Sequence, residues 1–130
     1  MAKFPSVEKV IEFNILALNI ISVKKADSAK VLSKTKISEV LKECKGDRGD
    51  IYDKAVVLLK GIIQKYPFAS GNRRTAFVTM KYFLGINRYK TRIKDDPKNA
   101  RPFQGIRESY YLDEEIKEWI KNGKIREFKR

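Results

Sequence analysis

The sequence predicts an all-α protein that forms a single domain over residues 1–130. Three observations lead to this fold class. Apolar residues recur at helical spacing in several segments, helix-capping residues precede most of these segments, and no two alternating segments look like paired strands. Apolar residues make up 42% of the chain, which suits a globular core and argues against disorder.

The first third of the chain contains the patterns of two or three helices. Ser6 is suited to cap a first helix, because its hydroxyl can accept a backbone N–H of the first turn. The apolar face predicted for this helix consists of Val7, Val10, Ile11, Ile15 and Leu18. Asp27 is predicted to cap a second helix through Val31 and Leu32, with a break near residues 33–35. The helical pattern that follows consists of Ile37, Val40, Leu41 and Cys44.

A central helix is predicted over residues 51–63, which are apolar on most sides. Asp50 and Asp53 precede and open it at nearly the spacing of a capping box. Gly61 in its interior indicates the close approach of a neighbouring helix. Pro67 ends the pattern and is predicted to push the preceding residue into an extended conformation.

A further helix is predicted to begin at Asn72, which is a good capping residue. Its buried face is predicted to consist of Ala76, Phe77, Met80, Phe83 and Leu84. Residues 89–93 alternate weakly and predict either a short strand or an extended tail. Residues 95–105 contain two prolines and predict a loop. Residues 112–121 predict the last helix, with acidic residues at its positive end.

The composition restricts the classes of function. Lys and Arg number 29 and Asp and Glu 16, which gives a net charge of +13 and favours an anionic partner such as a nucleotide, a nucleic acid or an acidic protein surface. Histidine is absent, which excludes catalysis and metal binding by that residue. Cys44 is the single cysteine, so a reducing cytoplasm is the expected location. No stretch has the length of a membrane span or the pattern of a signal peptide, so no membrane contact is predicted.

A stretch from Lys54 to Lys94 contains many basic residues and no acid. In its middle, a loop leads into a helix that begins with two arginines. Free backbone N–H groups, the positive end of a helix and guanidinium donors together predict a phosphate-binding site. The predicted ligands are Ser70, Gly71, Asn72, Arg73 and Arg74. Because arginine at this end opposes the helix dipole, the pair requires either an anion or a nearby acid.

This segment resembles the signature of the Fic/Doc family, which runs His-x-Phe-x-Asp/Glu-Gly/Ala-Asn-Gly/Lys-Arg. The positions that match are Phe68, Gly71, Asn72 and Arg74, and Pro67 and Phe68 stand at structural positions of the motif. The run of residues 73–76 is most similar to the Doc branch. The resemblance implies a helical bundle around a central helix–loop–helix, with a small flap or short strand, and binding of ATP or another nucleotide at the loop.

Two positions depart from the signature. Tyr66 stands where the family has its catalytic histidine, and Ser70 stands where it has an acidic metal ligand. An unperturbed phenol keeps its proton at neutral pH, so it is a weak base. A neutral hydroxyl is also a poor Mg²⁺ ligand. The comparison with the signature therefore implies that the chain has no metal ligand of its own and that Mg²⁺ arrives only with a nucleotide.

Three functional hypotheses follow, of which we favour the first. It is a Fic/Doc-like nucleotide- or phosphate-binding protein with a degenerate, catalytically impaired transferase site. Doc relatives are toxins held by an antitoxin, so the resemblance implies a toxin-related role with a protein target or an antitoxin as partner. The second hypothesis is an active phosphoryl- or nucleotidyl-transferase that uses Tyr66 in altered chemistry.

The third hypothesis is a basic nucleic-acid-binding protein, whose stacking surface would consist of Tyr82, Arg88, Tyr89, Lys90 and Arg92.

A separate feature concerns residues 45–49, between the patterns of two helices. The resemblance implies a reduced target-docking flap at this place, and an ordinary turn between helices accounts for the same residues equally well.

Overall fold

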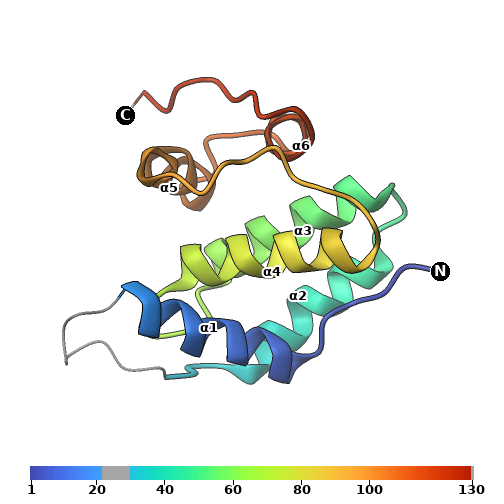
Figure 1. Ribbon diagram of the computed structural model, residues 1–130, viewed down its shortest axis with the longest axis vertical. Coiled ribbons are helices and arrows are strands. Elements are labelled where there is room, and N and C mark those ends of the chain that lie inside the picture. Colours follow the sequence, from blue (N-terminus) through green and yellow to red (C-terminus); the bar gives the residue numbers. More distant parts are fainter. Residues whose placement is uncertain (22–29, 130) are drawn as a thin grey trace.

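The computed structural model describes residues 1–21 and 30–129. These residues form six α-helices and one short 3-10 helix (Figure 1). The bounds are α1 Val7–Ile21, α2 Lys34–Gly46, α3 Ile51–Lys65, α4 Asn72–Ile86, η1 Pro97–Asn99, α5 Ala100–Arg107 and α6 Asp113–Asn122. The antiparallel helices α3 and α4 occupy the centre, with α1 and α2 on one side and α5 and α6 on the other (Figure 1). The prediction of an all-α bundle is confirmed for the described residues.

Helix α1 begins as predicted, and four of the five residues predicted for its apolar face pack against the core. The Ser6 hydroxyl accepts the Lys9 backbone N–H at 3.1 Å, which is the expected N-cap contact. The prediction that Ile15 lies on the buried face is wrong, because 43% of its surface is exposed. Val10 and Leu18 are buried as predicted, and the buried residues that the prediction did not include are Phe13, Asn14 and Ala17. The polar Asn14 among them concealed this part of the buried face in the hydropathy pattern.

The chain before α2 is extended rather than helical. The predicted cap Asp27 lies outside the described residues. The prediction of a helix through Val31 and Leu32 is wrong, because Val31 forms an isolated antiparallel bridge with Phe68. Helix α2 begins only after Ser33, whose hydroxyl accepts the Lys36 backbone N–H at 3.1 Å. The predicted break therefore marks the true start of a helix, whose buried residues are Ile37, Val40, Leu41 and Cys44.

Helix α3 is the central element, as predicted. Its capping box is formed: Asp50 Oδ1 accepts the Asp53 N–H at 2.9 Å, and Asp53 Oδ2 accepts the Asp50 N–H at 2.8 Å. The predicted close approach at Gly61 is also present, because a Cβ there would lie 2.8 Å from a methyl group of Val40 on α2. The buried residues of α3 are Ala55, Val56, Leu58, Leu59, Ile62 and Ile63.

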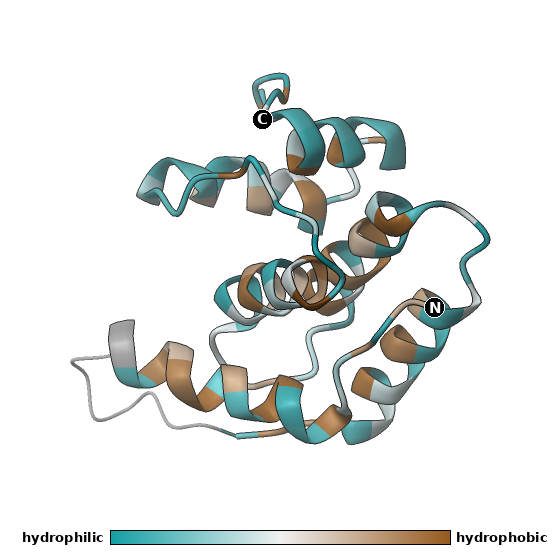
Figure 2. Cartoon of the chain, turned by 45° about the vertical axis from the view of Figure 1, so that its right-hand side comes forward, coloured by the Kyte–Doolittle hydropathy of each residue, from teal (hydrophilic) through white to brown (hydrophobic). Residues whose placement is uncertain are grey.

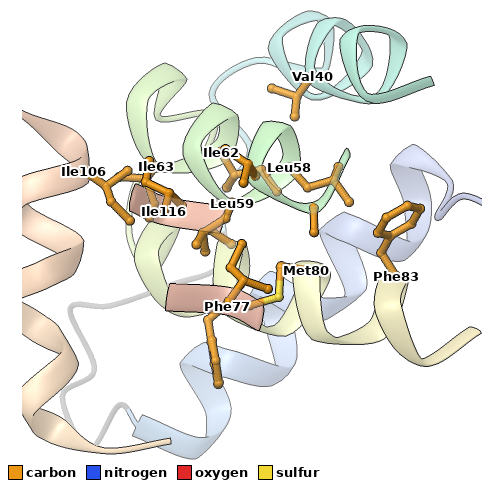
Figure 3. Close-up of a cluster of buried hydrophobic side chains, with 14 of the residues drawn as sticks. Val40, Leu58, Leu59, Ile62, Ile63, Phe77, Met80, Phe83, Ile106 and Ile116 are labelled. Carbon is orange, nitrogen blue, oxygen red and sulfur yellow. The ribbon is translucent and has the colours of Figure 1, made fainter. Parts of the chain in front are cut away.

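The core lies on both sides of the α3–α4 pair. Figure 3 shows α3 side chains between Val40 of α2 on one side and Ile106 and Ile116 of α5 and α6 on the other. All five residues predicted for the inner face of α4 are buried, from Ala76 to Leu84. The outer surfaces of α5 and α6 are hydrophilic (Figure 2), so the bundle is covered on this side by two amphipathic helices.

The C-terminal third differs most from the prediction. Residues 95–105 are not a loop, because η1 and α5 occupy Pro97–Arg107. The two prolines lie in the first turns of η1 and α5, where a backbone N–H has no intrahelical partner, so they are compatible with a helix. Residues 89–93 have no regular secondary structure, and the described residues contain no strand, so the short strand expected as one alternative is absent from them. Helix α6 and the following Gly123, whose φ is 77°, agree with the prediction.

Candidate anion-binding site

Helix α3 ends at a left-handed residue at the edge of the site. Tyr66 has φ 55° and ψ 56°, and its N–H donates to the Ile62 carbonyl at 3.2 Å. The predicted extended conformation is therefore wrong. Pro67 prevents the right-handed helix from continuing, and the chain leaves α3 through a left-handed C-cap instead. The Tyr66 side chain is left at the surface, with 40% of the residue exposed.

The loop between α3 and α4 is closed by the side chain of Asn72. The buried amide accepts the Phe68 N–H at 3.0 Å through Oδ1 and donates to the Phe68 carbonyl at 2.8 Å through Nδ2. Because the amide is engaged in this way, Asn72 is the first residue of α4 and not its cap. The cap position belongs to Gly71, whose φ is 76°. The prediction of Asn72 as the cap is wrong for this reason.

Helix α1 contacts the loop through the side chain of Asn14, a residue that is 1% exposed. Its Nδ2 donates to the Ser70 carbonyl at 2.9 Å and lies 3.1 Å from the Thr75 hydroxyl. A Cβ at Gly71 would lie 3.3 Å from this nitrogen and 3.2 Å from Leu18 Cδ2. Sequence reasoning missed Asn14. The available signal was a single amide inside an apolar helical face, since a buried polar group requires partners.

Residues 30–33, which we call the strap, pair with the same loop through backbone groups. The Leu32 and Ser33 N–H groups donate to the Pro67 carbonyl at 2.8 and 3.1 Å, and the Ala69 N–H donates to the Lys30 carbonyl at 3.0 Å. Phe68 between them is fully buried. The loop is therefore fixed from three directions: by Asn72, by α1 and by the strap.

A surface hollow of about 280 Å³ opens at the start of α4. Its lining consists of Tyr66, Gly71, Asn72, Arg73, Arg74 and Arg107. It thus brings together five of the predicted site residues and adds Arg107. Ser70 is not part of the lining, and its backbone carbonyl points to α1. Among the described residues, no acceptor binds the backbone N–H groups of residues 72–74, as is usual for the first turn of a helix.

The two arginines at the start of α4 are in different situations. Arg74 Nη1 lies 2.6 Å from Asp95 Oδ1, so a nearby acid compensates its charge. Arg73 forms no ion pair within residues 1–21 and 30–129 and lines the hollow half-buried. The sequence left open an anion or an acid as the explanation of the pair. The structure provides the acid for Arg74, whereas Arg73 has no acid beside it among the described residues.

Arg107 reaches the hollow from the end of α5. Its guanidinium carbon lies 4.1 Å from the centroid of the Tyr66 ring. Gln64 Nε2 donates to the Ile106 carbonyl at 2.9 Å, which ties the end of α5 to the last turn of α3. Sequence reasoning missed Arg107, because the segment that contains α5 was predicted as a loop and its distance from Tyr66 along the chain gives no signal.

Comparison with known proteins agrees with this arrangement. Residues 25–84 match the family model described as the Fic/DOC family. Over this segment, the chain is similar to the Fic/DOC family. The match covers α2, α3, the loop and most of α4, and it supports a Fic-like, nucleotide-related function. Helices α1, α5 and α6 lie outside it, and with them Asn14 and Arg107. No curated protein matches the chain.

The Fic/DOC segment has no cluster of metal ligands at the loop. Within the described residues, no group of three or more His, Cys, Asp or Glu could hold a metal ion. Asp95, the carboxylate beside the hollow, is paired with Arg74. Mg²⁺ prefers one or two carboxylates together with phosphate oxygens. The residues around the loop therefore do not fit a resident Mg²⁺ ion.

The two tyrosines proposed for nucleic-acid stacking pack against different helices. The ring of Tyr82 packs against Phe13 of α1 with a centroid distance of 5.1 Å, whereas Tyr89 packs against Tyr52 of α3 at 5.6 Å. Each aromatic ring thus already has a partner on a different helix. A row of bases would need successive faces along one groove.

Residues 45–49 comprise the end of α2 and most of its connection to α3, at the end of α3 that is remote from the loop between α3 and α4. A helix of 15 residues spans about 22 Å. This segment therefore lies far from the hollow and is a turn between two helices at that place.

In the part of the chain that the structure describes, no helix is both long and apolar enough to cross a membrane.

Proposed function

We propose that this Fic/DOC protein binds the phosphate groups of a nucleotide in the hollow at the start of α4, at a transferase site that has lost its chemical groups. The observation that carries the proposal is the convergence of Arg73, Arg74 and Arg107 on the unpaired N–H groups of α4. Guanidinium groups bind phosphate oxygens through paired hydrogen bonds. The positive end of the helix favours the same anion.

The size of the hollow supports a phosphate chain as the bound part. Pockets that enclose a whole small molecule have volumes of roughly 300–1,000 Å³, whereas this hollow has about 280 Å³. The base and ribose of a nucleotide would therefore lie outside the arginine-lined part. ATP is the ligand that we favour, with Mg²⁺ carried by its phosphates.

The loss of chemistry rests on Tyr66 and Ser70. A phenol is a weak general base at neutral pH, and a missing base reduces a rate by roughly 10²–10⁴-fold. Ser70 offers no carboxylate, and the structure places it outside the lining of the hollow. We therefore propose slow or undetectable transfer at neutral pH, while phosphate binding persists.

Calorimetric titration with ATP and ADP, with and without Mg²⁺, tests the binding. The double variant Arg73→Ala/Arg74→Ala should lose most of the affinity of the wild type. Lys81→Ala is the control for the loss of a positive charge from α4, because Lys81 lies exposed on the same helix outside the hollow. Unchanged affinity in the double variant would contradict the proposal. Competition by oligonucleotides with a steep dependence on salt would favour the nucleic-acid hypothesis instead.

A transferase that uses Tyr66 is the second candidate, because the Tyr66 ring lines the hollow. ATP labelled at the α or the γ position shows which group moves onto protein. The Doc-like run of residues 73–76 favours the γ-phosphoryl group. Fast labelling that is abolished by Tyr66→Phe would establish this candidate. Under the first proposal, labelling instead appears only after Tyr66→His/Ser70→Asp restores a base and a carboxylate.

The Doc-like run also supports a toxin-related role in the cytoplasm, with a protein target or an antitoxin as partner. Induced expression in a bacterial host tests this role directly. We expect slower growth with the wild type and normal growth with Arg73→Ala/Arg74→Ala at equal protein levels. Equal growth of both strains would contradict the toxin-related role and leave nucleotide binding unaffected.

A further inference from the structure

We propose that Arg107 is a third phosphate ligand of the hollow and that the Tyr66 ring is the platform that holds it, so that the site selects a polyphosphate chain over a single phosphate. This inference rests on the proposed function and deepens it. It assigns a binding role to a residue of α5, which lies outside the matched residues 25–84. It also gives the aromatic ring of Tyr66 a role that does not depend on its hydroxyl.

The contact between the two side chains leaves the donors of Arg107 available. The guanidinium carbon lies over the Tyr66 ring, 4.1 Å from its centroid, which is the distance of a cation–π contact. The five N–H donors of a guanidinium lie in its plane and not on its face. Within residues 1–21 and 30–129, Arg107 forms no ion pair. Its donors are therefore free to bind an anion in the hollow that it lines.

The backbone of Arg107 is held in place before any ligand binds. The preceding carbonyl, that of Ile106, accepts the Gln64 amide at 2.9 Å, and the same amide lies 3.3 Å from the Ser109 hydroxyl. The Ile106 side chain is 1% exposed and packs into the core. Together with the ring contact, these anchors reduce the entropy that Arg107 loses on binding.

The charge balance indicates the class of ligand. Three guanidinium groups line the hollow, and the charge of one of them, Arg74, is compensated by Asp95, which leaves two positive charges without an ion pair among the described residues. The free α4 N–H groups and Arg73 belong to the same helical turn and are suited to a terminal phosphate. Arg107 comes from a different helix and is suited to oxygens of the next phosphate. The ligand class is therefore a diphosphate or longer chain, as in nucleoside di- and triphosphates.

Calorimetric titrations with pyrophosphate, inorganic phosphate and ATP test the role of Arg107. Arg107→Ala and Arg107→Gln should each weaken pyrophosphate and ATP binding by about tenfold to a hundredfold, the range for a charge-assisted hydrogen bond. Binding of inorganic phosphate should change by less than about threefold. Arg107→Lys should recover only part of the affinity, because an ammonium cannot form the paired hydrogen bonds of a guanidinium. Lys81→Ala is the control for the lost charge.

Two variants of Tyr66 separate the ring from the hydroxyl. Tyr66→Phe keeps the platform and should bind pyrophosphate as the wild type does, within about twofold. Tyr66→Ala removes the platform and should weaken binding by roughly two- to fivefold, which is the value of a partly exposed cation–π contact. Equal losses in both variants would show that the hydroxyl matters and would overturn the platform role.

The outcomes distinguish this inference from the proposed function. If Arg107→Ala binds pyrophosphate like Lys81→Ala while Arg73→Ala/Arg74→Ala does not bind, the inference is wrong and the proposed function stands. If neither arginine variant changes the affinity, the proposed function itself fails. Thermal unfolding of each variant verifies the fold, and Arg107 is exposed, so its replacement leaves the core intact.

Discussion

The side chain of Asn72 and the backbone of Phe68 form two reciprocal hydrogen bonds, of 3.0 and 2.8 Å, that close the loop between α3 and α4. Both residues are buried. The amide thus satisfies a donor and an acceptor that have no water beside them. The position of Arg73 and Arg74 relative to Tyr66 depends on this closure, because these residues flank it along the chain.

Asn72→Ala should lower the free energy of unfolding by about 1–3 kcal/mol, because it leaves two buried groups of Phe68 without partners. Urea unfolding measures the change. The matched control is Asn19→Ala, which replaces an exposed asparagine of α1 and should have an effect below about 0.5 kcal/mol. Similar effects of the two substitutions would show that the closure contributes little to stability.

Gly71→Ala should destabilise the protein by about 1–3 kcal/mol. The residue has φ 76°, and a Cβ would meet Leu18 Cδ2 at 3.2 Å. Gly85→Ala is the opposite case, because no atom lies within 4 Å of its Cβ position inside α4. It should stabilise the protein by about 0.5–1 kcal/mol through helix propensity. Thermal and urea unfolding of both variants measure this difference in sign, and equal signs would contradict it.

The capping box of α3 should make the free energy of unfolding depend on pH. The hydrogen bond from the Asp53 N–H lowers the pKa of Asp50 below its usual 3.8, and the nearby Lys117 ammonium lowers it further. A lowered pKa means that this contribution is present above about pH 4 and is lost as the pH falls through the folded value. Asp50→Ala should cost about 1 kcal/mol at pH 7 and less at pH 3. Urea unfolding at both pH values measures the difference, and an equal cost would contradict the titration.

Cys44 should react slowly with thiol reagents in the folded protein. Burial raises its pKa from 9.0 to about 12, and its Sγ lies 3.5 Å from the Lys54 carbonyl. The native reaction rate with an aromatic disulfide should increase strongly when urea unfolds the chain. Because the folded pKa is the higher one, the thiol's contribution to stability is full below about pH 9 and is lost between pH 9 and 12. Equal rates in native and unfolded protein would contradict this placement.

The sequence was sufficient for the elements whose signals are local. The hydropathy pattern of residues 51–63, the box at Asp50 and Asp53 and the loop at Gly71 depend on neighbours within four residues, and all three are present in the structure. The family signature at the loop is equally local. These signals predicted the central helix pair and most of the lining of the hollow.

Contacts between distant residues could not be predicted in this way. Arg107 meets Tyr66 only because Gln64 ties α5 to the end of α3. Asn14 lies on the buried face of α1 because the Ser70 carbonyl and the Thr75 hydroxyl are its hydrogen-bond partners. A hydropathy pattern, however, places a polar residue on the exposed face. Both residues depend on tertiary packing, which periodicity does not encode.

The strap has a consequence for how freely the sequence around the loop can vary. Its three hydrogen bonds join main-chain groups only, with donors at Leu32, Ser33 and Ala69. The side chains of Leu32 and Ala69 can therefore be exchanged without loss of the pairing, provided that neither becomes proline, which has no N–H, whereas the Ser33 hydroxyl is also needed to cap α2. These positions should thus tolerate many different side chains but not the loss of a backbone N–H. The shape of the arginine-lined hollow can in this way be retained even when the side chains of the strap change.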